Sequence, residues 1–98
     1  MKLIWSEQAI KNLQTIFEYI AADSEEKAAR VINVLVQCPE SLLDFPHMGA
    51  TVPELPLSGL RELLKYSYRI VYAINDEQIQ IVAVIHDRQS FKKAFYHK

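Results

Sequence analysis

The sequence predicts an α+β fold in which an antiparallel sheet of three to four strands packs against two N-terminal helices. Apolar residues recur with a period near 3.6 between residues 9 and 35, which is typical of amphipathic helices. After Gly59 the period changes to two, which is typical of strands. The chain has 98 residues, half of them hydrophobic, with only 2 Gly and 4 Pro. This composition predicts one compact domain over residues 1–98.

The first third of the chain predicts a strand and two helices. Lys2-Leu3-Ile4-Trp5 is a strand-forming run, and Ser6 suits the N-cap of a helix that continues to Ala21. Asp23-Ser24 ends that helix, and Glu25-Glu26 place negative charge at the start of the next, where the helix dipole favours it. The buried stripe of the second helix is expected to consist of Ala28, Val31, Ile32 and Leu35.

Prolines divide the middle of the chain. Pro39 interrupts the second helix because its ring clashes with the preceding turn and it has no amide hydrogen. A short helical piece through Leu42 and Leu43 is expected to end before Pro46. Residues 47–58 predict an irregular crossing segment.

The last third predicts a three-stranded meander over Leu60–Leu64, Tyr68–Ile74 and Gln78–His86, followed by a short C-terminal helix or arm. The element order is therefore β-α-α-β-β-β. If Asp76-Glu77 forms a two-residue loop, the apolar face of the last hairpin pairs Ile74 with Ile79, Tyr72 with Ile81, Ile70 with Ala83, and Tyr68 with Ile85. We expect the two helices to cover this face.

The other face of the hairpin is the candidate functional surface. In this register Arg69 faces Val84, and His86 is its diagonal neighbour. Arg88 joins them if the strand continues, and Arg61 joins them if the preceding turn has three residues. Such a cluster suits phosphate or carboxylate recognition. The alternative is that each is a strand residue paired with an acid, namely Glu62, Glu54 or Asp87.

Composition excludes several classes of protein. Cys38 is the one cysteine, so no disulfide forms within the chain, and a reducing cytoplasm is the expected location. No apolar run approaches the roughly 20 residues that a membrane span requires. The three histidines lack metal-ligand spacing, and neither a metal nor a cofactor is expected.

Charge is unevenly distributed along the chain. Residues 1–60 hold four basic and eight acidic residues, a net charge of −4, whereas residues 61–98 hold seven basic and four acidic residues, a net charge of +3. The second half therefore suits an anionic partner, or the difference is scatter in a small sample. A sequence pI near 6.3 lies well below the value expected of a dedicated nucleic-acid binder.

Several ordered segments resemble the RelE/ParE superfamily of type II toxin-antitoxin toxins. They are Lys2-Leu3-Ile4-Trp5, Asn12-Leu13, Phe45-Pro46 before Gly49, Val52-Pro53-Glu54-Leu55, Gly59-Leu60-Arg61-Glu62-Leu63, Tyr68-Arg69-Ile70-Val71-Tyr72 and Val84-Ile85-His86-Asp87-Arg88. The resemblance implies the same fold. It also implies a growth-inhibiting toxin that a cognate antitoxin neutralises, with operator DNA bound only through the antitoxin.

The resemblance implies one of two targets. ParE-like toxins poison DNA gyrase, whereas RelE-like toxins cleave messenger RNA on the ribosome. In the second case Glu54 would be the base, Arg69 and Arg61 the charge stabilisers, and His86 the acid. The loop 47–58 has no lysine, whereas RelE places lysines there, and the low pI suits the ribosome poorly.

A ParE-like gyrase poison is therefore preferred to an enzyme. A toxin-fold protein that binds an antitoxin but has lost activity is a third possibility. The residues expected to contact the target are Arg69, His86, Arg88, Lys92, Lys93 and Tyr96.

Overall fold

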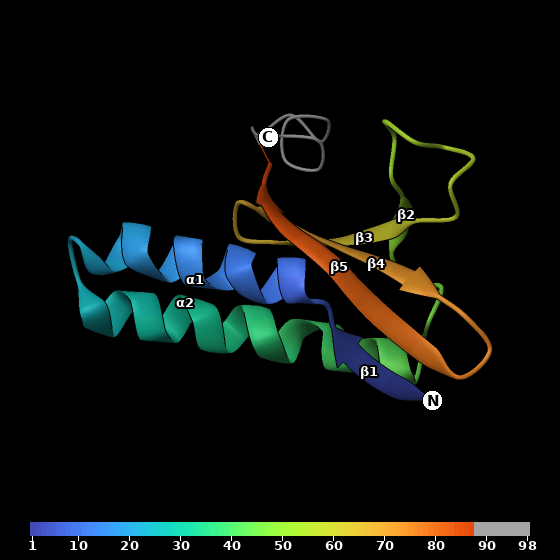
Figure 1. The fold of residues 1–98 in the computed structure, drawn as a ribbon, viewed down its shortest axis with the longest axis horizontal. Helices are drawn as coiled ribbons and strands as arrows, with labels where there is room; N and C mark the ends of the chain where they lie inside the picture. The colour runs from blue at the N-terminus through green and yellow to red at the C-terminus, as the bar shows by residue number, and fades with distance from the viewer. Residues whose placement is uncertain (88–98) are drawn as a thin grey trace.

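One five-stranded sheet and a pair of helices make up the computed structural model, which describes residues 1–87 (Figure 1). The strand order is β1-β5-β4-β3-β2. The bounds are β1 Lys2–Trp5, β2 Ala50–Thr51, β3 Arg61–Lys65, β4 Tyr68–Ile74 and β5 Gln78–His86. The predicted α+β class and element order are confirmed, but the sheet has five strands instead of three to four, because residues 50–51 pair with β3. The pairing of β1 with β5 is parallel, the exception in an otherwise antiparallel sheet.

The two helices begin where the sequence predicts. Helix α1 spans Glu7–Ala21, and the Ser6 hydroxyl accepts a hydrogen bond from the amide of Ala9 at 3.0 Å. Helix α2 spans Glu25–Gln37 and is capped in the same way by Ser24. At Pro39 the chain tightens into the 3₁₀ helix η1, Cys38–Leu43, because proline is tolerated in the first turn of a helix. The predicted C-terminal helix or arm lies outside the described residues.

The helix pair covers one face of the sheet. The core on this side joins Ala9 of α1, Leu35 of α2 and Leu42 of η1 to buried strand residues; those residues are Ile70, Tyr72, Ile79, Ile81 and Val84. The sequence predicts a functional surface on the opposite face, but the structure shows that this face is partly covered. The crossing segment folds back over it, and Val52 packs there with Val71, Ala83 and Ile85.

A bulge changes the register of the β4–β5 hairpin. Near the turn the pairs Ile74 with Ile79 and Tyr72 with Ile81 are as predicted, but the next pair is Val71 with Ala83, which leaves Val82 as an extra residue. Beyond this bulge the predicted pairings of Ile70 with Ala83 and of Tyr68 with Ile85 are wrong. The structure pairs Ile70 with Val84 and Tyr68 with His86.

The turn between β3 and β4 also differs from the prediction. Lys65 pairs with Tyr68, so the turn contains only Tyr66 and Ser67, and Tyr66 adopts a left-handed backbone with φ 54°. The shorter turn pairs Arg61 with Tyr72, which is on the side of the helices. A one-residue change in a turn reverses the face of every residue in the strand.

Tyr72 ties the segment before β2 to the sheet. Its buried hydroxyl donates to the carbonyl of Pro46 at 2.8 Å and accepts from the amide of Gly49 at 2.9 Å. A Cβ atom at position 49 would lie 2.5 Å from the Glu62 carbonyl oxygen and 2.7 Å from the Tyr72 hydroxyl. Glycine is therefore required at position 49 by this close approach.

Candidate functional site

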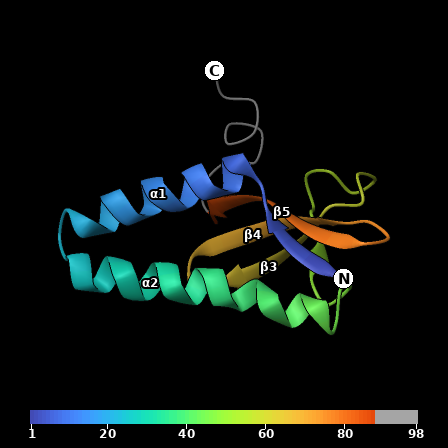
Figure 2. The same ribbon diagram turned by 60° about the horizontal axis from the view of Figure 1, so that its bottom comes forward.

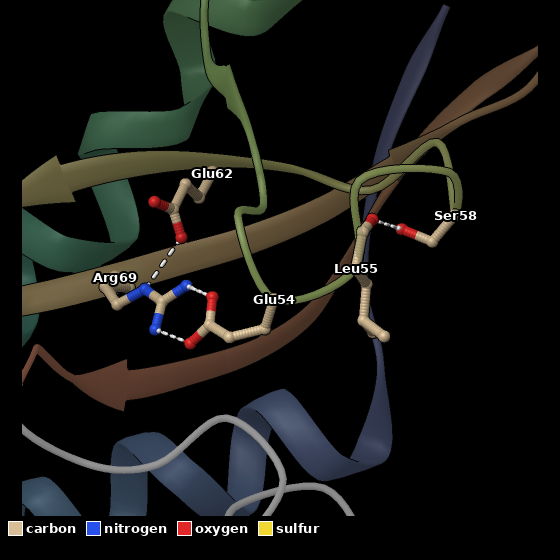
Figure 3. A network of polar contacts seen from close by, with 5 residues as sticks. All are labelled: Glu54, Leu55, Ser58, Glu62 and Arg69. Carbon is tan, nitrogen blue, oxygen red and sulfur yellow. Dashed lines mark hydrogen bonds and ion pairs between the residues drawn. The ribbon is translucent and has the colours of Figure 1, made fainter.

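The candidate site centres on Arg69, whose side chain lies on the face of the sheet opposite the helices (Figure 3). Its Nη1 and Nη2 atoms donate to the two carboxylate oxygens of Glu54, each at 2.7 Å. Its Nε atom donates to Glu62, also at 2.7 Å. The cross-strand pairing explains the second contact, since Glu62 lies opposite Val71 on the same face as Arg69.

Two of the three side chains in this network are largely buried. The Arg69 side chain is 8% exposed and that of Glu62 is 10% exposed, whereas Glu54 is 39% exposed. Hydrogen bonds from Arg69 hold the pKa of Glu54 below its ordinary value, and those to Glu54 and then Glu62 raise the pKa of the Arg69 guanidinium. The bidentate geometry is the strongest arrangement of a guanidinium with a carboxylate. The network thereby fastens residues 52–60 to the sheet.

His86 does not share this surface. Because of the bulge it pairs with Tyr68, and the two rings meet edge to face with centroids 5.6 Å apart on the side of the helices. Its Nδ1 atom lies 3.2 Å from a carboxylate oxygen of Asp87. The predicted cluster of Arg69 with His86 is therefore wrong, and the physical reason is the residue inserted at Val82.

Arg61 is also separated from Arg69. It pairs with Tyr72 on the helix side, and its Nη2 atom donates to the carbonyl of His47 at 3.1 Å. Of the alternatives that the sequence offered, pairing with acids is confirmed for Arg69, whose partners are Glu54 and Glu62. The predicted contacts Arg88, Lys92, Lys93 and Tyr96 lie outside the described residues.

A second feature is a groove on the helix side, which the sequence did not predict. It has a volume of about 1060 Å³. It lies between the C-terminal end of α1, the N-terminal part of α2, the β3–β4 turn and the end of β5. Aromatic and apolar residues line it, among them Tyr19, Ile20, Val31, Tyr66 and Tyr68. The sequence offers one signal for this groove, namely the apolar helix residues Ile20 and Val31. In the structure both of these residues are only half-buried.

Residues 1–87 contain neither a candidate metal-binding cluster nor a membrane-spanning helix. Within that range no group of three His, Cys, Asp or Glu side chains is placed to hold a metal ion. In the same range no helix has the length and apolar character needed to span a bilayer. Burial, the larger influence, raises the pKa of the Cys38 thiol. A half-buried thiol with a raised pKa is a poor nucleophile.

Comparison with known proteins decides the family. The model of the family described as "ParE toxin of type II toxin-antitoxin system, parDE" matches residues 3–91. The chain belongs to this ParE toxin family. It is thus a toxin of a type II toxin-antitoxin system, as the resemblance implied. Among curated proteins no sequence matches at a significant level.

Two solved structures support the ParE-type fold. The chromosomal ParDE toxin-antitoxin system of P. aeruginosa superposes with a TM-score of 0.73 at 24% identity, over 88% of this chain and 95% of that one. The toxin-antitoxin complex RelBE2 of Mycobacterium tuberculosis gives a TM-score of 0.58 at 22% identity, over 87% and 95% of the two chains. At these identities the similarity establishes the fold. One of these structures is described as a toxin-antitoxin system and the other as a toxin-antitoxin complex.

Proposed function

We propose that this ParE-family toxin inhibits growth by binding DNA gyrase and does not cleave messenger RNA. The observation that carries the proposal is the hydrogen bonding of Arg69. All three of its guanidinium nitrogens donate to Glu54 or Glu62. Glu54, the base of the alternative mechanism, is the bidentate partner. A carboxylate whose pKa is lowered by a guanidinium is a weak base near neutral pH.

The other residues of the alternative mechanism are equally ill placed for it. An RNA-cleaving site needs base, acid and charge stabiliser within hydrogen-bond reach of one phosphate. Here His86 and Arg61 lie on the helix side of the sheet, whereas Arg69 and Glu54 lie on the opposite side. This separation favours a toxin that works by binding.

The remaining parts of the proposal concern partners and location. The toxin acts in the cytoplasm as a single domain and is neutralised by a cognate antitoxin, and operator DNA is bound only through that antitoxin. Neither a cofactor nor a metal takes part. Arg88, Lys92, Lys93 and Tyr96 remain predicted contacts of the target.

Two assays with purified toxin test the proposal. In a supercoiling assay, the toxin is expected to inhibit gyrase in proportion to its concentration. In a translation reaction with ribosomes, primer extension is expected to show intact messenger RNA. Codon-linked cleavage that requires ribosomes would overturn the proposal in favour of the nuclease, and inactivity in both assays with antitoxin binding retained would identify an inactive toxin-fold protein.

The variant Glu54→Gln sharpens the test because it removes the candidate base but keeps a hydrogen-bonding side chain of the same size. Gyrase inhibition by this variant is expected to stay within about threefold of that of the original toxin. A nuclease that uses Glu54 as base would lose about 10²-fold or more of its activity.

A further inference from the structure

Residues 52–60 form a closed loop between β2 and β3, and in both views this loop stands out from the sheet at the end away from the α1–α2 turn (Figures 1 and 2). Its two ends meet where the amide of Val52 donates to the carbonyl of Leu60 at 3.1 Å. Val52, Leu55 and Leu60 pack on the face of the sheet opposite the helices. The segment therefore has the form of an Ω-loop, a compact surface loop that frequently carries function.

The tip of this loop is held by hydrogen bonds of its own. The amides of Leu55 and Ser58 donate to the carbonyls of Val52 and Leu55, each at 3.1 Å, which gives two successive turns. The Ser58 hydroxyl donates to the carbonyl of Leu55 at 2.7 Å and accepts from the amide of Leu60 at 3.1 Å (Figure 3). Gly59 follows with φ 81°, a backbone conformation that glycine adopts readily. The tip is therefore fixed before any partner binds.

Leu57 lies at this fixed tip with its side chain in solvent. It is 98% exposed, the highest value among the large apolar side chains of the described residues. Folding does not account for a leucine at this position, because a side chain so exposed buries almost no apolar surface within the chain. The nearby Pro53 and Pro56 are also exposed, so the tip presents an apolar surface to solvent.

The charge of the loop indicates the kind of partner. Glu54 is the one charged residue between positions 52 and 60, and its carboxylate is already paired with Arg69. The loop thus offers no cation to a phosphate backbone, on which nucleic-acid binding depends. An uncharged leucine beside prolines is complementary to an apolar pocket of a protein. Because the loop is already ordered, little conformational entropy is lost when such a pocket receives it.

We propose that Leu57 anchors the toxin to its target by entering an uncharged, apolar pocket on the surface of gyrase. The inference rests on the proposed function and adds a contact surface within the described residues. A projecting tip requires a concave site on its partner, which a large folded enzyme supplies and a short peptide segment does not. Ser58 is a positioning residue, because its hydroxyl fixes the backbone on both sides of Leu57.

Two measurements on the full-length toxin test the anchor: calorimetric binding to purified gyrase and inhibition of supercoiling. Leu57→Ser is expected to weaken both at least tenfold, because burial of a leucine side chain is worth about ten- to a hundredfold in affinity. Leu64→Ser is the matched control, since Leu64 is a 67% exposed leucine at the other end of β3, beside the β3–β4 turn. Its affinity is expected to change less than twofold. Thermal unfolding should be nearly unchanged in both variants.

The positioning role of Ser58 is tested separately. Ser58→Ala removes the hydroxyl, and it is expected to weaken gyrase binding about threefold and to speed amide hydrogen exchange at Leu60 in the free toxin. Ser58→Thr keeps a hydroxyl and is expected to restore both values. Faster exchange in Ser58→Ala without any loss of affinity would overturn the positioning role.

The outcomes separate this inference from the function on which it rests. If the original toxin binds gyrase and Leu57→Ser binds equally well, the loop inference alone is overturned. It is also overturned if Leu57→Ser inhibits gyrase normally but no longer binds the cognate antitoxin, because the tip then belongs to the antitoxin surface. If the original toxin does not bind gyrase, the proposed function fails and the inference fails with it.

Discussion

Arg69 is the one polar or charged residue that is buried in the described part of the molecule. Arg69 is held by Glu62 from the neighbouring strand and by Glu54 from the crossing segment. The resemblance to nucleases would assign this arginine to catalysis. Its burial and its partners assign it instead to holding residues 52–60 on the sheet.

Replacing Arg69 with alanine is therefore expected to destabilise the fold. The substitution leaves the Glu62 carboxylate buried without its guanidinium, and breaking a buried ion pair costs about 3–5 kcal/mol. Urea denaturation followed by circular dichroism measures the loss. Glu54→Gln is the milder comparison, because position 54 is partly exposed, and it is expected to cost about 1 kcal/mol.

A loss of less than about 0.5 kcal/mol in Arg69→Ala, the range of ordinary surface substitutions, would contradict this account. Such a small loss is the expectation for an arginine on an exposed face of the sheet. The two accounts are therefore separated by a single measurement.

At the scale of elements, the β4–β5 hairpin decides what the sequence could and could not predict. Alternation along each strand correctly predicted the strands and the pairs next to the turn. It could not predict the bulge, because Val82 is an ordinary strand residue and nothing in its neighbourhood marks an insertion. The shift beyond Val82 then moved His86 to the other face.

Helix α1 supplies the groups that stabilise this bulge. The amide of Ser6 donates to the carbonyl of Ile81, and the Ser6 hydroxyl donates to the carbonyl of Val82 at 3.2 Å. The side-chain oxygen of Asn12 accepts from the amide of Val84 at 3.0 Å. Since β1 pairs only with residues 78–81 of β5, these polar groups take the place of a neighbouring strand.

Asn12→Ala is expected to lower the free energy of unfolding by about 1–2 kcal/mol, because it leaves the Val84 amide without its acceptor. Asn12→Asp keeps an acceptor at the same position and is expected to remain within about 0.5 kcal/mol of the original protein. Thermal unfolding of the two variants is the measurement. Equal stabilities for the alanine and aspartate variants would show that the contact contributes nothing.

At the scale of the whole molecule, the pH dependence of stability should report the Arg69 network. The pKa of Glu54 is lower in the folded protein than its ordinary value of 4.5, mainly because Arg69 donates hydrogen bonds to it. The ionised Glu54 carboxylate therefore stabilises the folded protein above pH 4.5. This stabilisation is lost as the pH falls through the lower pKa that Glu54 has in the folded protein.

The melting temperature is accordingly expected to fall less steeply below pH 4.5 in Glu54→Gln than in the original protein. The two curves should converge toward pH 3, since protonated glutamic acid and glutamine are both neutral. A constant gap between the curves from pH 7 to pH 3 would show that the ionised form of Glu54 makes no contribution. Differential scanning calorimetry across this range provides both curves.

The layers and their order could be predicted from the sequence, because periodicity reports which residues are buried. The groove could not, since its lining comes from the helix pair, residues 66–68 and His86, which lie far apart in the sequence. The sequence also could not predict that a segment covers the second face of the sheet. The segment 52–60 carries Val52 and Leu55 into that cover, yet its prolines indicated only an irregular path.

The parallel pairing of β1 with β5 joins residues 2–5 to residues 78–81. A ribosome makes the first of these strands long before the second, and chains begin to fold from the end that emerges first. The growing polypeptide therefore holds β1 without its partner strand β5 until β5 has been translated. The sheet of this toxin therefore cannot be completed until the ribosome has made residues 78–81.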